Sequence, residues 1–208
     1  MSVGGKAEDG IVSRYINRRI STKISGFIIS HWSDPNPFVA TVVSLFAGVL
    51  AGAAYIYTTE FVGGILAQLA SILDGVDGEL ARATGKTSRL GAFIDTLLDR
   101  VVDFVILISI YYSFFKVFMG DWLYPSMIYF YSVFAWIMVS YFHSVLRSLD
   151  GERRIQTGLY RFASRDVRIF IVFIFSLFGL GFYGVVLAGL VSTIYLVYSG
   201  ARIYHLLR

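Results

Sequence analysis

The stretch DGVDGELAR (residues 74–82), followed after eight residues by GAFIDTLLD (residues 91–99), decides the fold and the chemistry of this chain. Its four aspartates occur in two pairs, Asp74 with Asp77 and Asp95 with Asp99. On helices these spacings place each pair on one face. A carboxylate at membrane depth costs about 2.5–3.5 kcal/mol. The stretch therefore predicts a neutralising cation, and ligands that are all carboxylate oxygens favour a hard divalent ion.

The composition predicts an integral, multi-pass membrane protein of one domain. The chain has 208 residues, of which 56% are hydrophobic, and its mean hydropathy is +0.67. It contains apolar runs near twenty residues, the length that spans a bilayer. Cysteine is absent, which excludes a disulfide framework and a thiolate metal site. The partners expected are the lipid bilayer and small substrates, with no nucleic acid.

The N-terminal part predicts a linker and a surface helix. Residues 1–10 are expected to be a linker or disordered, compatible with a longer polypeptide, and they lack the apolar core of a signal peptide. Residues 11–30 predict a juxtamembrane amphipathic helix lying on the membrane. The alternative is a solvated helix that packs on a soluble partner domain. The apolar stripe at helical spacing contains Val12, Ile16, Ile20, Ile24 and Phe27.

Residues 31–208 predict an all-α domain of six transmembrane helices. The expected spans are 38–57, 61–84, 88–118, 123–146, 165–182 and 184–204. Of the 18 Lys and Arg residues, all except Lys116 fall on one side of this topology. Because positive charge favours the cytoplasmic side, both termini and the aspartate stretch are expected there.

The aspartate stretch also predicts a diphosphate site. A short loop joins its two helices, so they are expected to be antiparallel neighbours whose ends bring the four carboxylates together. Two magnesium-like ions could be held there and completed by phosphate oxygens. Gly75, Gly78 and Gly91 each cost a helix interior about 1 kcal/mol relative to alanine, which indicates close approach of a ligand or backbone. Arg82 adds a fixed positive charge suited to a diphosphate.

These residues carry a resemblance to a known family. The pattern Asp-x2-Asp-Gly-x2-Ala-Arg-x8-Gly-x3-Asp-x3-Asp resembles the signature of the CDP-alcohol phosphotransferases, and this chain matches all eight fixed positions. Asp34-Pro35-Asn36 is similar to the Thr-Pro-Asn that often precedes the family's first span, with Asp34 in place of threonine. The matching positions are Asp74, Asp77, Gly78, Ala81, Arg82, Gly91, Asp95 and Asp99.

The resemblance implies a reaction that depends on Mg²⁺ (or Mn²⁺), with two ions per site, in a homodimer. An acceptor hydroxyl attacks the β-phosphorus of a CDP-alcohol, and CMP leaves. Asp74, Asp77, Asp95 and Asp99 would bind the metal ions, and Asp99 would also act as the general base. The implied CDP-binding residues are Asn36, Asp74, Gly78, Ala81, Arg82 and Gly91.

Arginines and a lysine near the basic side are candidates to bind a phosphate on the acceptor. Arg165 and Arg168 are favoured, because they share a face at the start of a span, where the helix dipole also attracts anions. Positive charge that only sets topology is the alternative. The further candidates are Lys86, Arg89 and Arg202.

Segments 9–14, 63–79 and 165–168 are similar to the inositol-phosphate branch of the family, the di-myo-inositol-phosphate-phosphate synthases. That branch joins CDP-inositol to inositol phosphate and is often fused to a cytidylyltransferase domain, so a fused or associated domain is an expected partner. The alternative is a phospholipid synthase that uses CDP-diacylglycerol or CDP-archaeol.

Two other classes compete with this interpretation. A membrane prenyltransferase also uses aspartates and Mg²⁺, but its acidic clusters occur twice, far apart. A cation transporter places acidic residues near the bilayer midplane, beside broken helices. Two acidic residues stay open: Asp103 either supports the metal ligands or pairs with Arg100, and Glu79 is expected to face away from the site.

Overall fold

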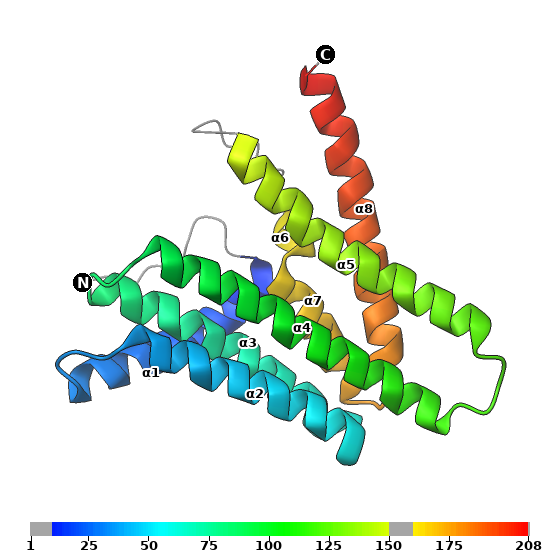
Figure 1. The fold of residues 1–208 in the computed structure, drawn as a ribbon, viewed down its shortest axis with the longest axis horizontal. Helices are drawn as coiled ribbons and strands as arrows, with labels where there is room; N and C mark the ends of the chain where they lie inside the picture. Colours follow the sequence, from blue (N-terminus) through cyan, green and yellow to red (C-terminus); the bar gives the residue numbers. More distant parts are fainter. Residues whose placement is uncertain (1–9, 150–159, 208) are drawn as a thin grey trace.

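The computed structural model describes residues 10–149 and 160–207, and within these ranges every regular element is a helix (Figure 1). The prediction of an all-α chain is confirmed. Of the predicted linker at residues 1–10, residues 1–9 lie outside the described residues, and Gly10 is buried. The elements are η1 (a π-helix, Ser13–Asn17), α1 (Arg18–His31), α2 (Pro37–Tyr57), α3 (Glu60–Ala83), α4 (Arg89–Val117), α5 (Leu123–Leu149), α6 (Tyr160–Ala163), α7 (Arg165–Ser176) and α8 (Gly181–Leu207).

Four helices among the described residues are long and apolar enough to cross a membrane, which makes this an integral membrane protein. They are α2, α3, residues Leu123–Leu146 of α5 and residues Gly181–Arg202 of α8. Helix α4 is longer than any of these, but acidic and basic residues interrupt it from its first residue to Lys116. Helix α7 has only 12 residues. Six spans therefore stay a prediction.

The predicted boundary between the last two spans is wrong. Helix α7 ends at Ser176, short of the expected 182, and α8 begins at Gly181. Gly179 adopts a φ of 70°, and the Leu180 amide donates to the Phe175 carbonyl oxygen at 3.0 Å. This is the arrangement that closes many helix C-termini, and glycine favours it because its φ is positive.

Helix α2 packs on both α3 and α4, so α3 and α4 touch each other only sparsely. The α2–α4 contact is close because α2 has glycines there: a Cβ on Gly48 would lie 2.5 Å from Val102 Cγ1, and one on Gly52 would lie 2.5 Å from Val105 Cγ1. The two helices that carry the aspartates are thus held by a third helix rather than mainly by each other.

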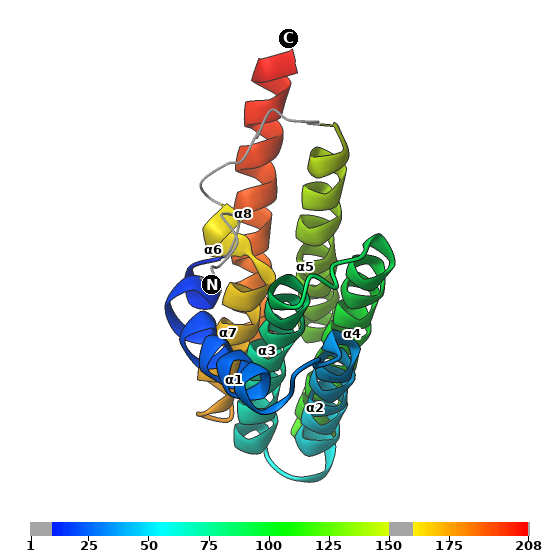
Figure 2. The same cartoon turned by 90° about the vertical axis from the view of Figure 1, so that its left-hand side faces the viewer.

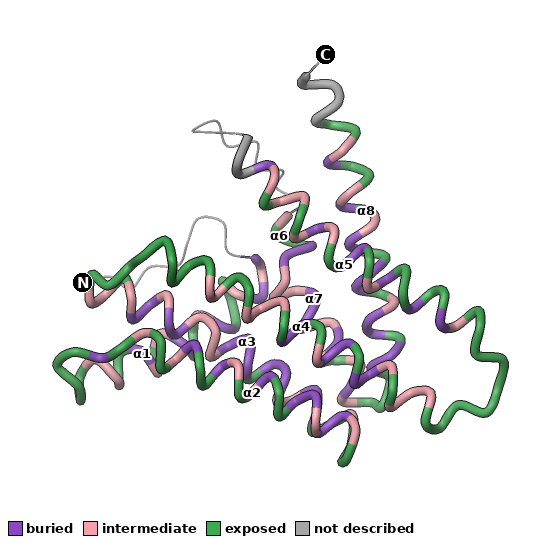
Figure 3. Tube along the Cα trace, viewed as in Figure 1, coloured by how far each residue is buried: buried purple, intermediate pink, exposed green. Residues whose placement is uncertain are grey.

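The second half of the chain forms its own layer. Helix α8 packs on α5 and α7, and α7 also packs on α3. The C-terminal part of α8 extends beyond the other helices in both views (Figures 1 and 2). The buried parts of the helices face the interior of the bundle (Figure 3), where aromatic side chains including Tyr55, Tyr129 and Trp136 join the core.

Helix α1 packs on α3 through its polar side. Asn17, Ser21 and Ser25 are buried, whereas Ile20 and Phe27 of the apolar stripe are 44% and 59% exposed. Helix α1 thus turns part of its apolar stripe away from the protein, and its role as an amphipathic helix on the membrane surface stays a prediction.

The α5–α8 contact yields a stability prediction. A Cβ on Gly189 would lie 2.6 Å from the Cα atom of Ser132, so Gly189→Ala should push the two helices apart. Overpacking of this kind costs about 1–3 kcal/mol, and the thermal unfolding midpoint in detergent should fall. Gly200→Ala is the control in the same helix, because a Cβ there meets nothing within 4 Å. Equal midpoints for Gly189→Ala and the unsubstituted protein would contradict the close packing.

Candidate functional site

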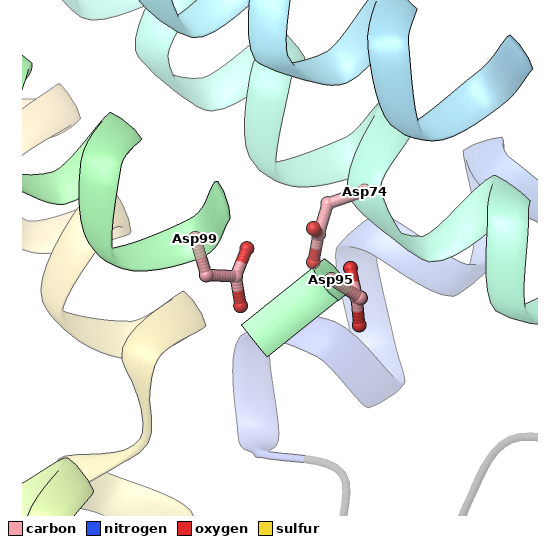
Figure 4. A group of neighbouring side chains, drawn as sticks. All are labelled: Asp74, Asp95 and Asp99. Carbon is pink, nitrogen blue, oxygen red and sulfur yellow. The ribbon is translucent and has the colours of Figure 1, made fainter. Parts of the chain in front are cut away.

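Three of the four signature aspartates form one group. Asp74 projects from α3, and Asp95 and Asp99 project from α4, one helical turn apart. Each offers a carboxylate oxygen, and these oxygens all lie within 4.8 Å of one another. Figure 4 shows the three carboxylates gathered around one space. This donor set suits a hard divalent cation, which prefers oxygen ligands.

Asp77 stands beside this group without joining it. It is buried, and its Oδ2 accepts a hydrogen bond of 2.7 Å from the Thr41 hydroxyl of α2. Its Oδ1 accepts from the backbone amide of Gly78. Thr41 of α2 therefore orients Asp77, one of the predicted metal ligands, which belongs to α3. No motif in the sequence predicts this contact.

Two cavities flank the aspartates. Cavity A has a volume of about 330 Å³ and lies between the N-terminal helices, α3, α4, α5 and α7. Besides Asp74, Asp95 and Asp99, its polar wall includes Asn17, Arg18, Ser21, Ser71, Arg100, Ser140, His143, Ser144, Tyr160, Ser164 and Arg165.

Cavity B has a volume of about 390 Å³ and lies between the start of α2, the end of α3 and the start of α4. Asp77 lines it, and so does Asp95, which also lines cavity A. Asp95 therefore stands at the boundary between the two cavities.

Most of the predicted CDP-binding residues come together in cavity B. Asn36, Gly78, Ala81 and Gly91 line it, although they come from three different parts of the chain. Asn36 also caps α2, because its Oδ1 accepts from the Phe38 amide at 3.0 Å. Two predicted residues lie elsewhere. Asp74 lines cavity A. Arg82 is exposed, with Nη1 3.2 Å from the position of a Cβ on Gly78.

Among the predicted acceptor residues, Arg165 lies in cavity A. Its Nη1 lies 2.9 Å from Asp99 Oδ1 and 3.4 Å from Asp74 Oδ2. Its Nε lies 2.9 Å from Asp103 Oδ1, and Asp103 Oδ2 accepts from Arg100 at 2.9 Å. Of the two alternatives for Asp103, the pair with Arg100 is the one observed, and its other oxygen meets Arg165 beside Asp74 and Asp99.

The other predicted acceptor residues are dispersed. Arg168 is buried, stacks over Trp136 at 4.8 Å and donates to the Ser140 hydroxyl at 3.1 Å, so it lines neither cavity. Lys86 lines cavity B and pairs with Asp34 at 2.5 Å. Arg89 and Arg202 are exposed and line neither of the two cavities. The spacing of Arg165 and Arg168 predicts a shared helix face, but their side chains contact different parts of the protein.

The sequence reasoning missed the N-terminal contribution to the site. Arg18 lines cavity A and pairs with Glu79 at 2.8 Å. Glu79 does face away from the aspartates, as expected, but it is buried against α1. Ser21 and Ser25, four residues apart in a helix with an apolar stripe, were the available signal for this contact.

Comparison with known proteins identifies the family of this chain. The model of the family described as CDP-alcohol phosphatidyltransferase matches residues 35–198. The Aquifex aeolicus protein named "Bifunctional IPC transferase and DIPP synthase" is 35% identical over 82% of this chain, which spans only 39% of that relative. The Pyrococcus horikoshii "Archaetidylinositol phosphate synthase" is 33% identical, over 76% of this chain and 78% of its own.

A solved structure agrees with the fold. Mycobacterium tuberculosis phosphatidylinositol phosphate synthase (PgsA1), crystallised with CDP-DAG bound, has a TM-score of 0.67 at 21% identity, covering 87% of this chain and 92% of that one. The match of the family model extends over both aspartate pairs, Asn36 and Arg165. This chain therefore belongs to the CDP-alcohol phosphatidyltransferase family.

Proposed function

We propose that the protein transfers a phospho-alcohol group from a CDP-alcohol to an acceptor hydroxyl and releases CMP. The CDP group occupies cavity B, and the acceptor occupies cavity A. The observation that carries this proposal is the position of Asp95, which lines both cavities. A diphosphate placed against Asp95 from cavity B would present its β-phosphorus to a hydroxyl in cavity A. None of the relatives described above is a cation transporter.

The chain's own residues have distinct roles in this reaction. Asp74, Asp95 and Asp99 would hold one divalent ion, Mg²⁺ or Mn²⁺, and Asp77 with Asp95 would contribute to a second. Bound divalent ions neutralise the diphosphate and stabilise negative charge on the leaving CMP. Asp99 faces cavity A, where it accepts the proton of the acceptor hydroxyl. The acceptor oxygen then bonds to the β-phosphorus, and the bond from that phosphorus to the bridging oxygen breaks.

The favoured substrates are CDP-inositol and inositol phosphate, which give di-myo-inositol phosphate phosphate. Two features support this choice. The relatives include proteins named as DIPP synthases. Cavity A combines Arg165 with several serine hydroxyls, a lining that suits an acceptor with both a phosphate and many hydroxyls.

A lipid donor, CDP-diacylglycerol or CDP-archaeol, is the second candidate. An apolar cavity of about 380 Å³ between α1, α2 and α3 shares Asn36 with cavity B. Its wall includes Ile28, Trp32, Val39 and Val43, which suits a hydrocarbon chain. The name of the Pyrococcus horikoshii relative points the same way.

The membrane arrangement follows from the same proposal. Helices α4 and α7 are the two further spans, because the charged residues inside them line cavity A or, like Asp103 and Arg168, are buried, and Arg89 and Lys116 lie at the helix ends. The exposed apolar side of α1 rests on the bilayer surface. The excess of Lys and Arg then puts the site and both termini on the cytoplasmic side. A homodimer and a cytidylyltransferase domain, fused or associated, complete the proposed assembly.

The direct test is CMP release from the purified protein with Mg²⁺. CDP-inositol and CDP-diacylglycerol are compared as donors, each with inositol phosphate as the acceptor. We expect CMP release that requires both inositol compounds, and Asp99→Asn should lower kcat by about 100- to 10,000-fold because it removes the general base. The control is Asp121→Asn in the loop before α5, where the amide oxygen can still cap the helix. Release of CMP from CDP-diacylglycerol alone would establish the lipid reaction, and no release from either donor would refute the proposal.

Metal binding gives a second prediction. Asp74→Asn, Asp95→Asn and Asp99→Asn each remove one charged oxygen from the group of three, so each should weaken Mn²⁺ binding by about tenfold or more. Titration calorimetry of the protein with Mn²⁺ alone measures this effect, with Asp121→Asn as the unaffected reference. If the three variants bind Mn²⁺ as well as the reference does, the aspartates are not metal ligands.

A further inference from the structure

Glu79 is a buried carboxylate in the aspartate stretch that the proposed reaction does not use. Glu79 is only 1% exposed, although Arg82, three residues later in the same helix, is exposed. The Ser21 hydroxyl donates to Glu79 Oε1 at 2.7 Å, and the Ser25 hydroxyl donates to Oε2 at 2.7 Å. Arg18 Nη1 lies 2.8 Å from Oε1. These partners of Glu79 all belong to α1.

Helix α1 depends on these contacts for its position. Its buried residues are Ser21 and Ser25, and its apolar residues are exposed or half-buried. Apolar contacts of the half-buried Ile24 and Ile28 contribute part of its docking, and the hydrogen bonds to a charged group add to it. The dependence is mutual, because the donors that stabilise the buried Glu79 carboxylate come from α1.

The docked N-terminal helices form one wall of cavity A. Asn17, Arg18 and Ser21 all line it. Arg18 Nη1 also donates to the carbonyl oxygen of Gly75 at 3.1 Å, next to Asp74. At the other end of the segment, Asp166 Oδ2 of α7 accepts from the Ser13 amide at 2.5 Å. Two carboxylates from different helices thus fix the wall that faces the three aspartates.

We infer that Glu79 is a positioning residue for the acceptor site: it holds α1 on α3 so that Arg18 faces the acceptor and the N-terminal wall of cavity A stays in place. The inference rests on the proposed function in one respect, namely that the acceptor occupies cavity A. It adds an N-terminal wall to a site that the signature aspartates and Arg165 alone leave open on that side.

The kinetic test separates positioning from general stability. Glu79→Ala should raise the KM for inositol phosphate by about 10- to 100-fold, the effect of losing one hydrogen bond to a charged group, and leave the KM for CDP-inositol unchanged. Glu79→Gln should recover part of the loss, because its amide can still bond to the serines. Glu60→Ala is the matched control: it lies in the same helix and loses a contact of similar kind, the 2.7 Å bond from the Gly181 amide, far from both cavities. An unchanged acceptor KM in Glu79→Ala, or an equal rise of both KM values, would overturn the inference.

A crosslinking test needs no activity, so it can fail independently of the proposed function. A Cβ on Gly75 would lie 3.6 Å from Ser21 Cβ, within the range for a disulfide, and the chain has no native cysteine. Protein with Ser21→Cys and Gly75→Cys should form this disulfide readily under mild oxidation. Adding Glu79→Ala should slow its formation by about tenfold or more, whereas adding Glu60→Ala should not. Equal rates with and without Glu79 would show that Glu79 does not hold α1.

Discussion

The site depends on the compensation of negative charge around Arg165. This guanidinium contacts Asp74, Asp99 and Asp103, three carboxylates from two helices. Carboxylates that are largely withdrawn from water need compensating charge, and one guanidinium cannot neutralise three of them. Asp103 has Arg100 as a second partner, which leaves Asp74 and Asp99 with excess negative charge beside Asp95. This excess of negative charge suits the group to a divalent cation. It also holds Arg165 in the wall of cavity A.

Helix α2 turns this charge cluster into a site with two sides. Because α2 packs on both α3 and α4, these two helices make few contacts with each other, and a gap remains beside their carboxylates. One side of the gap, cavity B, is lined by Gly78, Ala81 and Gly91, whose small side chains leave room for a nucleotide. The other side, cavity A, is walled by polar residues of the N-terminal helices and of α3 to α7. Asp95 belongs to both, so the proposed donor and acceptor approach one carboxylate from opposite directions.

The sequence predicted the parts of the site that follow from spacing along one helix. The pairing of Asp95 with Asp99 and the helical class are of this kind, since helical periodicity decides which residues share a face. Asp77 instead meets Thr41 of another helix. Contacts between distant elements were not predictable in this way. Arg168 shares a face with Arg165 but meets Trp136 and Ser140, and Glu79 found its partners on a helix more than fifty residues earlier. The end of α7 at Ser176 was also missed, because Gly179 lies within a continuous apolar run.

The most direct test of this account is a structure of the protein with Mn²⁺ and CDP bound. We predict the nucleotide in cavity B, in contact with Asn36, Gly78 and Ala81, and its diphosphate against Asp95 with Mn²⁺ between the aspartates. Cavity A would then remain open for the acceptor beside Arg165. A nucleotide seated in cavity A, with its diphosphate on Arg165, would contradict the assignment of the two cavities.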